Sequence, residues 1–181
     1  MSIQTIEGNL LDQPGILVHG CNCHGVMGAG IALAFRRKWP DVFTAYQNVH
    51  RTRGLKLGEV VVVASAHDQF EPWAQAIAAQ VELWSPQLPK GTVVVNLMSQ
   101  KDFGSNPNTV YVSYDAIEAG FRDGVAALAK ATGFGVSFPL IGCGLANGKW
   151  EEVSARIESA LADDIVKTLV VVSLVKAWCR S

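Results

Sequence analysis

The chain has 181 residues, of which 49% are hydrophobic and 17% are charged, and its formal net charge is -1. This composition excludes wholesale disorder, and the length suits a single domain with its own hydrophobic core, so we predict one domain over residues 1–181. The near-neutral charge and the lack of a long basic block argue against a general nucleic-acid binder, which neutralises phosphates with many Lys and Arg residues.

The ends of the chain and its cysteines bear on the compartment. The first residues contain no basic stretch followed by an apolar core, and no apolar run approaches membrane-spanning length. Four cysteines, at positions 21, 23, 143 and 179, suit a reduced setting. We therefore expect a cytoplasmic protein that does not bind membranes.

Six apolar segments of strand length recur along the chain. They are SIQTIEG at 2–8, GILVHG at 15–20, EVVVVAS at 59–65, TVVVNLM at 92–98, GVSFPLI at 135–141 and TLVVVSLV at 168–175. Several carry successive valines instead of alternating with polar residues, which is typical of strands covered on both faces.

Helical patterns fill the gaps between these segments. IALAFRRKW at 31–39 follows the second strand, and apolar residues recur every three or four positions over 72–84, 114–128 and 150–161. Gly120 and Gly124 weaken the pattern of the third of these helices. Strands that alternate with helices predict an α/β fold with crossover connections, and the long connection 67–91 is expected to carry its helix on an outer face.

Three loops that follow predicted strands carry the candidate binding site. They are GNL at 8–10, CNCHGVMGAG at 21–30 and PLIGCGLANGKW at 139–150. Loops at the carboxyl ends of strands are where open α/β sheets bind ligands. Glycines let the backbone approach a phosphate closely, and the free N–H groups of a helix start favour negative charge. Two such turns in one small domain can hold both halves of a diphosphate.

These motifs resemble the macrodomains, a family of ADP-ribose-binding α/β modules, over nearly the whole chain. The matching pieces are GNLL at 8–11, HGCNCHGVMGAGIALAF at 19–35, VVVNLMSQK at 93–101 and FPLIGCGLANGKW at 138–150. The resemblance is strongest to the branch that contains terminal ADP-ribose protein glycohydrolase and the ADP-ribose-1″-phosphate phosphatases. It implies a three-layer α/β/α fold with a central mixed, mostly parallel six-stranded sheet, and a cleft for ADP-ribose at the strand carboxyl ends.

The resemblance also assigns roles to residues. It implies that Asn9 accepts a hydrogen bond from the adenine amino group, that Asn22 contacts the distal ribose, and that residues 27–32 and 141–146 surround the diphosphate. The implied ligand-binding residues are Gly8, Asn9, Leu10, Asn22, Met27, Gly28, Ala29, Gly30, Ile31, Ala32, Ser99, Ile141, Gly142, Cys143, Gly144, Leu145 and Ala146.

Two positions depart from the glycohydrolase branch. That branch has a lysine nucleophile where this chain has Gln100, with Lys101 one residue later, and an aspartate where this chain has Ala146. An amide and a methyl group supply neither a nucleophile nor a proton carrier, so release of ADP-ribose from protein carboxylates by that mechanism is not expected. Hydrolysis of a terminal phosphate rests more on positioning and electrostatics. We predict His24 as its acid/base and Asn22 as the residue that orients the ribose or the attacking water.

The predicted activity is therefore hydrolysis of ADP-ribose-1″-phosphate to ADP-ribose and phosphate. One alternative is a reader that binds free or protein-linked ADP-ribose without turnover. Another is a hydrolase of a different ADP-ribose ester or linkage, such as O-acetyl-ADP-ribose or an ADP-ribosylated macromolecule.

Several other residues were considered as metal ligands, as a nucleophile or as ligand contacts. The spacing of His19, Cys21, Cys23 and His24 fits a structural zinc site poorly, so neither a metal nor a cofactor is predicted. Cys143 has no base within its own loop. Phe103 is a candidate to close over the distal ribose, and Trp178 is a candidate to approach the adenine.

Overall fold

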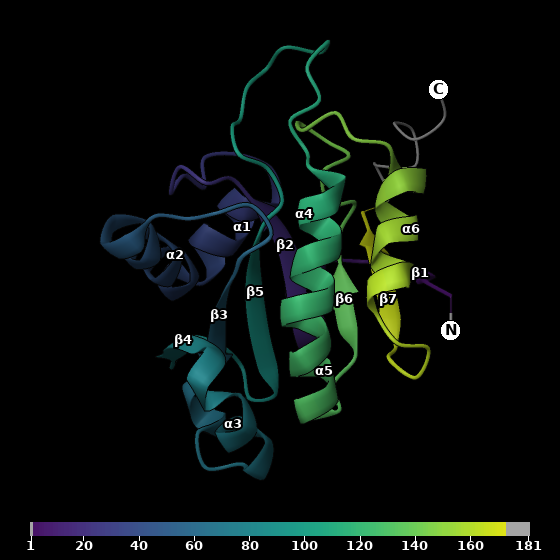
Figure 1. Cartoon of the computed structure of the whole chain (residues 1–181). Helices are drawn as coiled ribbons and strands as arrows, with labels where there is room; N and C mark the ends of the chain where they lie inside the picture. Colours follow the sequence, from purple (N-terminus) through teal and green to yellow (C-terminus); the bar gives the residue numbers. More distant parts are fainter. Residues whose placement is uncertain (1, 173–181) are drawn as a thin grey trace.

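One sheet of seven strands organises the chain in the computed structural model, which describes residues 2–172 (Figure 1). The strands are β1 (Gln4–Glu7), β2 (Gly15–Cys21), β3 (Val60–Ser65), β4 (Val81–Ser85), β5 (Thr92–Met98), β6 (Val136–Phe138) and β7 (Lys167–Val171). Their order across the sheet is β1-β7-β6-β2-β5-β3-β4. The first five in that order run parallel, whereas β3 is antiparallel to β5 and β4 is parallel to β3.

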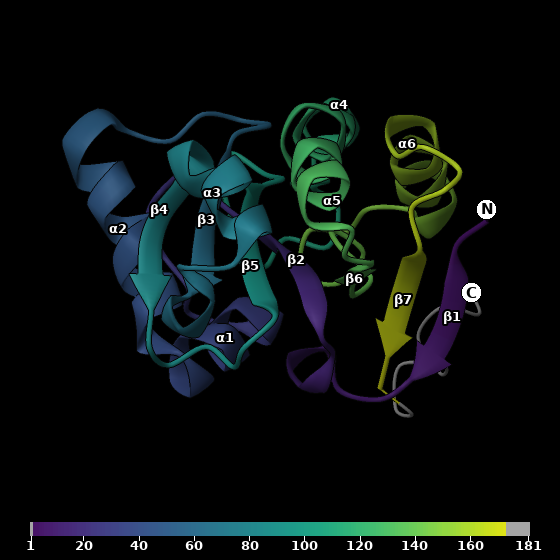
Figure 2. The ribbon, with the colours of Figure 1, turned by 90° about the horizontal axis from the view of Figure 1, so that it is seen from below.

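Helices cover both faces of the sheet (Figure 2). The helices are α1 (Gly30–Lys38), α2 (Pro40–Arg53), α3 (Pro72–Ile77), α4 (Tyr114–Ala119), α5 (Ala126–Thr132) and α6 (Trp150–Ala160). Alternate residues of the central strands serve opposite layers: Ile16 and Val18 of β2 pack in the cluster beneath α4, α5 and α6, while Leu17 packs in the cluster beneath α1 and α2. The predicted three-layer α/β/α architecture is confirmed.

All six predicted strands are present within the described residues, with a seventh that was not predicted. The prediction of a helix over 72–84 is wrong in its second half, because α3 ends at Ile77, a single 3₁₀ turn follows, and Val81–Ser85 form β4 at the edge of the sheet. The apolar residues of this short segment fit either period, and only pairing with β3 selects the strand. The connection 67–91 thus holds a helix and a strand.

The predicted helix from Tyr114 is confirmed but continues further, to Thr132, through a π-helical segment at Gly120–Val125. The two glycines that weakened the prediction have a packing role. A Cβ on Gly120 would overlap the Leu97 side chain of β5, and one on Gly124 would lie 2.7 Å from Val60 Cγ2 of β3. Glycine therefore brings this helix close to the sheet.

The helix that begins at Gly30 is also confirmed, with its basic residues in the last turn. No helix was predicted over the residues of α2, which starts with proline at its first position and packs beside α1. Trp39, Trp73, Trp84 and Trp150 lie in or against the core. Trp178 and Cys179 lie outside the described residues.

Candidate functional site

The parallel strands bring the predicted loops to one edge of the sheet. β1, β2, β5 and β6 all run in the same direction, so the segments 8–10, 21–30, 99–113 and 139–150 that follow them lie at the same edge. The loop 99–113 between β5 and α4 projects beyond this edge, at the top of the molecule in Figure 1. The expected gathering of the three loops is therefore present, joined by a fourth segment.

The first glycine turn, residues 21–30, presents His24 beside a carboxylate. His24 Nε2 lies 2.7 Å from Asp102 Oδ1, and both side chains are about half exposed. The His24 ring also meets the edge of the Phe103 ring, with 5.9 Å between centroids. The pairing orients the imidazole, which is one way that a carboxylate supports a histidine acid/base.

Backbone bonds fix this pair in place. The Gln100 N–H donates to the Cys21 carbonyl at 3.3 Å, and the Cys23 N–H donates to the Lys101 carbonyl at 3.1 Å. The Gln100 side chain donates to the Asp102 carbonyl at 2.8 Å. The start of loop 99–113 is thereby attached to the His24 turn, and Asp102 is set by main-chain contacts.

The Asn22 side chain makes hydrogen bonds within the same turn and to Tyr46. Its Oδ1 accepts from the His24 N–H at 2.8 Å and from the Tyr46 hydroxyl at 3.0 Å, while its Nδ2 donates to the Val26 carbonyl at 2.7 Å. One amide hydrogen is the only capacity left, because the oxygen already has two donors. Asn22 can therefore donate a hydrogen bond to a ribose hydroxyl, but its oxygen has no lone pair left to accept one from water.

The start of α1 carries free backbone donors. Its N-cap residue, Ala29, makes no side-chain capping bond, and Gly28, Ala29 and Gly30 are exposed. Gly30 has a φ of 57°, and no atom lies within 4 Å of the position of a Cβ there. Uncapped N–H groups beside open space are what an anion requires at a helix start.

The second glycine turn, residues 139–150, is held by backbone bonds and by its Asn147 side chain, which donates to the carbonyls of Asn106 at 3.0 Å and Thr109 at 2.8 Å. Gly142 has a φ of 74° and Gly148 donates to its carbonyl at 2.8 Å, with Val112 packed against both. The Ala146 carbonyl accepts the N–H groups of Tyr111 and Val112. No atom lies within 4 Å of a Cβ at Gly144, so the backbone there is open to a ligand.

The third segment caps a 3₁₀ turn with Asn9. Asn9 Oδ1 accepts from the Leu11 N–H at 3.1 Å, and its Nδ2 donates to Asp12 Oδ2 at 3.0 Å. Asp12 in turn pairs with Lys38 Nζ at 2.7 Å, and this contact together with Asn9 lowers the pKa of the Asp12 carboxyl. One lone pair and one amide hydrogen of the exposed Asn9 remain for a base.

The predicted ligand-binding residues divide into exposed and buried groups. Gly28, Ala29, Gly30, Gly144 and Leu145 are exposed at the edge, and Gly8, Ile31, Ala32, Gly142 and Cys143 are half-buried there. The side chains of Leu10, Met27, Ser99, Ile141 and Ala146 are buried. The other members of this buried group can contact a ligand only through their backbones. Ser99 differs, because its Oγ has no hydrogen-bond partner among the described residues and could bond a ligand.

The residue that sequence reasoning missed is Asp102. The aspartate expected from the glycohydrolase branch is absent at Ala146, which is buried, and no replacement was predicted. The structure supplies a carboxylate to His24 from a different loop. The only sequence signal is an acidic residue soon after the end of β5, and it does not point to His24.

The histidine and the cysteine of β2 are buried parts of the core. His19 is buried, stacks on Phe35 with 4.2 Å between ring centroids, and bonds Asn96 Oδ1 through Nε2 at 2.7 Å. Burial lowers the pKa of His19 to about 4, although its bond to Asn96 opposes the shift, and burial raises the pKa of Cys21. No group of three or more His, Cys, Asp or Glu side chains that could hold a metal occurs within residues 2–172.

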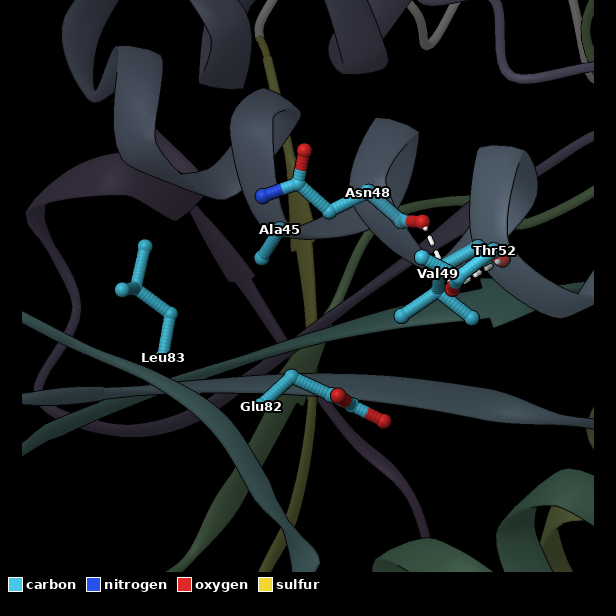
Figure 3. Close-up of a pocket in the computed structure, with 6 residues that line it drawn as sticks. All are labelled: Ala45, Asn48, Val49, Thr52, Glu82 and Leu83. Carbon is cyan, nitrogen blue, oxygen red and sulfur yellow. Dashed lines mark hydrogen bonds between the residues drawn. The ribbon is translucent and has the colours of Figure 1, made fainter.

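A pocket of about 200 Å³ lies elsewhere, between α2 and the edge strand β4 (Figure 3). Its lining residues are Ala45, Asn48, Val49, Thr52, Glu82 and Leu83. None of these side chains belongs to the loops at the carboxyl edge, so the pocket is separate from the candidate site. Across residues 2–172, no helix has both the length and the apolar character needed to cross a membrane.

Sequence comparisons find a family model and curated relatives that match parts of this chain. A Macro domain family model covers residues 18–81. A DNA ADP-ribosyl glycohydrolase of Mycobacterium tuberculosis is 28% identical over 80% of this chain and 34% of the relative. An ADP-ribose 1″-phosphate phosphatase of Aspergillus oryzae is 34% identical over 56% of this chain and 49% of the relative. The chain thus spans about a third to a half of the length of the curated relatives it matches.

The fold is shared with solved macrodomains. The structure of a macrodomain protein from Streptomyces coelicolor has a TM-score of 0.68 at 25% identity and covers 94% of this chain and 99% of that one. Sequence motifs, relatives and sheet topology agree. In sequence and in fold, the chain is similar to macrodomains.

Proposed function

We propose that the chain binds ADP-ribose at the carboxyl edge of its sheet and hydrolyses ADP-ribose-1″-phosphate to ADP-ribose and phosphate. The observation that carries the proposal is the pairing of His24 Nε2 with Asp102 Oδ1 at 2.7 Å, on the turn that also leads to the uncapped start of α1. An oriented acid/base thus lies on the same short loop as free anion donors. The names of the relatives support the same class of substrate.

The reaction divides between these two parts. The backbone N–H groups of the two glycine turns hold the diphosphate and neutralise its charge. A water molecule attacks phosphorus, the bond from phosphorus to the sugar oxygen breaks, and that oxygen leaves with a proton. His24 carries the proton between the water and the leaving oxygen, while Asp102 holds the imidazole in place.

Gln100 and Ala146 favour a second candidate, a reader that binds ADP-ribose without turnover. The Gln100 amide is engaged with the Asp102 carbonyl and the Ala146 methyl is buried, so neither position offers a nucleophile or a proton carrier. Binding through the two glycine turns would remain intact.

The decisive experiment measures release and binding together. Purified protein is incubated with ADP-ribose-1″-phosphate, O-acetyl-ADP-ribose and ADP-ribosylated protein or DNA, and ADP-ribose binding is followed by calorimetry. We expect phosphate release from the first substrate. Tight ADP-ribose binding with no release from any substrate would identify a reader, and release only from another substrate would replace the proposed reaction.

His24→Ala tests the assigned acid/base. We expect phosphate release to fall on the order of a hundredfold or more, with ADP-ribose affinity changed only a few-fold. His67→Ala is the matched control, because His67 follows the antiparallel strand β3 and lies at the opposite edge of the sheet. Equal turnover by His24→Ala and the wild type would remove His24 from the mechanism.

A further inference from the structure

Tyr46 of α2 joins the core to the first glycine turn. Its side chain is fully buried in the cluster beneath α1 and α2. The hydroxyl shares its proton between the Asn22 carbonyl at 2.7 Å and Asn22 Oδ1 at 3.0 Å, and it accepts from the Val26 N–H at 3.2 Å. One buried oxygen therefore contacts both ends of the segment 22–26.

The Asn22 side chain extends this contact to His24. The same Oδ1 that receives the Tyr46 hydroxyl also accepts the His24 N–H at 2.8 Å, and Asn22 Nδ2 closes the turn onto the Val26 carbonyl at 2.7 Å. Burial raises the pKa of the Tyr46 phenol, so the hydroxyl remains a neutral donor at neutral pH. The His24 N–H and the Tyr46 hydroxyl therefore donate to the same atom, Asn22 Oδ1.

Neighbouring residues on the same side of α2 complete the support. Gln47 Nε2 donates to the Gly25 carbonyl at 3.4 Å. Gly25 has a φ of 73°, and a Cβ added there would lie 2.8 Å from His50 Nδ1, so the turn lies directly against the helix. The turn has no room to shift toward α2, and the Tyr46 hydroxyl opposes its movement away.

We propose that Tyr46 is a positioning residue for the reaction at this edge: it fixes the backbone of the turn so that the imidazole of His24 meets Asp102 and the substrate. The proposal rests on the proposed function of His24. Two restraints act on different parts of that histidine, since Tyr46 acts through Asn22 on the backbone and Asp102 acts on the ring.

Tyr46→Phe removes only the hydroxyl. We expect the His24 and Val26 amides to exchange with solvent roughly tenfold faster or more, because Val26 loses its acceptor and the acceptor of His24, Asn22 Oδ1, loses the hydroxyl that holds it. The kcat for ADP-ribose-1″-phosphate should fall about tenfold or more, while KM and the Kd for ADP-ribose change only a few-fold. Because a loss of folded protein would also lower the apparent kcat at unchanged KM, kcat is calculated per ADP-ribose binding site, counted by calorimetry.

Ser65→Ala is the matched control. The buried Ser65 hydroxyl also donates to a backbone carbonyl, that of Leu88 at 3.0 Å, and accepts a backbone N–H, that of His67 at 3.3 Å, but it lies at the opposite edge of the sheet. We expect wild-type exchange at His24 and Val26 and a wild-type kcat in this variant. A folded Tyr46→Phe protein with unchanged exchange and unchanged kcat would overturn the proposal.

The wild-type protein gives an independent test if Tyr46→Phe fails to fold. In the wild type, the His24 and Val26 amides should be protected from exchange relative to those of the exposed loop 103–108. Exchange at the loop's rate would overturn the proposal. A wild type that binds ADP-ribose but releases no phosphate would contradict the proposed reaction, and the amide exchange would still decide whether Tyr46 fixes the turn.

Discussion

The two glycine turns at the carboxyl edge look alike in sequence but differ in how they are held. Turn 21–30 is supported by side chains from other elements, Tyr46 and Asp102, and it presents a titratable residue. Turn 139–150 is supported by backbone bonds, by Val112 packed against its glycines, and by side-chain bonds of Asn147 and Tyr114 to backbone groups. Its Cys143 thiol donates to the Ile141 carbonyl. The first arrangement suits proton transfer and the second suits passive binding of an anion.

This difference shows why a glycine pattern by itself does not identify a catalytic turn. Glycines allow close approach of a ligand in both turns. Chemistry requires in addition a side chain held in one orientation by partners that are far away in the sequence. If the roles divide in this way, substitutions in and around the two turns should affect turnover, binding and stability differently.

His19, in the strand β2 that leads into the first turn, should make the free energy of unfolding depend on pH. Asn96 Nδ2 donates to the carbonyls of Val42 and Val61, so Asn96 Oδ1 accepts from His19. Burial lowers the pKa of His19, so the ring is neutral near neutral pH. Because the folded pKa of about 4 lies below the ordinary value of 6.5, the unfolded chain binds a proton first as the pH falls. The free energy of unfolding should therefore decrease between about pH 6.5 and 4, by up to about 3 kcal/mol.

Urea unfolding at several pH values measures this effect. The His19→Gln variant should lose most of the pH dependence over that range, whereas His67→Gln should keep it, because His67 is exposed at the other edge. Identical pH slopes in His19→Gln and the wild type would contradict a neutral buried His19.

Gly142→Ala should destabilise the second turn. The substitution places a Cβ at a φ of 74° and 2.5 Å from Val112 Cγ2, so it combines backbone strain with overlap. We expect a loss of about 2 kcal/mol in the free energy of unfolding, measured by urea titration. A variant as stable as the wild type would show that the turn can relax and is not fixed by Val112.

Asp102→Asn should lower turnover without affecting the second turn. The amide keeps the shape of the carboxylate but makes a weaker hydrogen bond to the imidazole and orients it less firmly, so we expect kcat for ADP-ribose-1″-phosphate to fall about tenfold. Asp123→Asn serves as the control, because Asp123 is an exposed partner of Arg122 on the π-helical segment. A wild-type kcat for Asp102→Asn would mean that His24 acts without its carboxylate partner.

Gly144→Ala should separate binding from stability. A Cβ at this position meets no atom within 4 Å and Gly144 has no positive φ, so the free energy of unfolding should change by less than about 0.5 kcal/mol. The methyl group would occupy the open space proposed for the ligand, and calorimetry should show ADP-ribose affinity reduced a few-fold. Unchanged affinity would place the ligand away from Gly144.

Much of the fold was predictable because strong local patterns specify it. The valine runs of β3 and β5 are covered on both faces, and the glycine turns follow strands directly, so the family resemblance and the site's edge could both be read from the sequence. The segment 78–85 could not, since its few apolar residues fit a helix and a strand equally and its pairing with β3 decided the outcome.

The sequence alone determined the three layers, the edge of the sheet where the loops meet, and His24 as the candidate acid/base. Only the tertiary structure decided what holds His24: Asp102 lies 78 residues away along the chain, and Tyr46 acts from a helix that carried no predicted role. The physical reason is the distance along the chain over which each interaction acts. Periodicity and glycine content act within a few residues, whereas hydrogen bonds between buried or facing side chains depend on how distant segments pack.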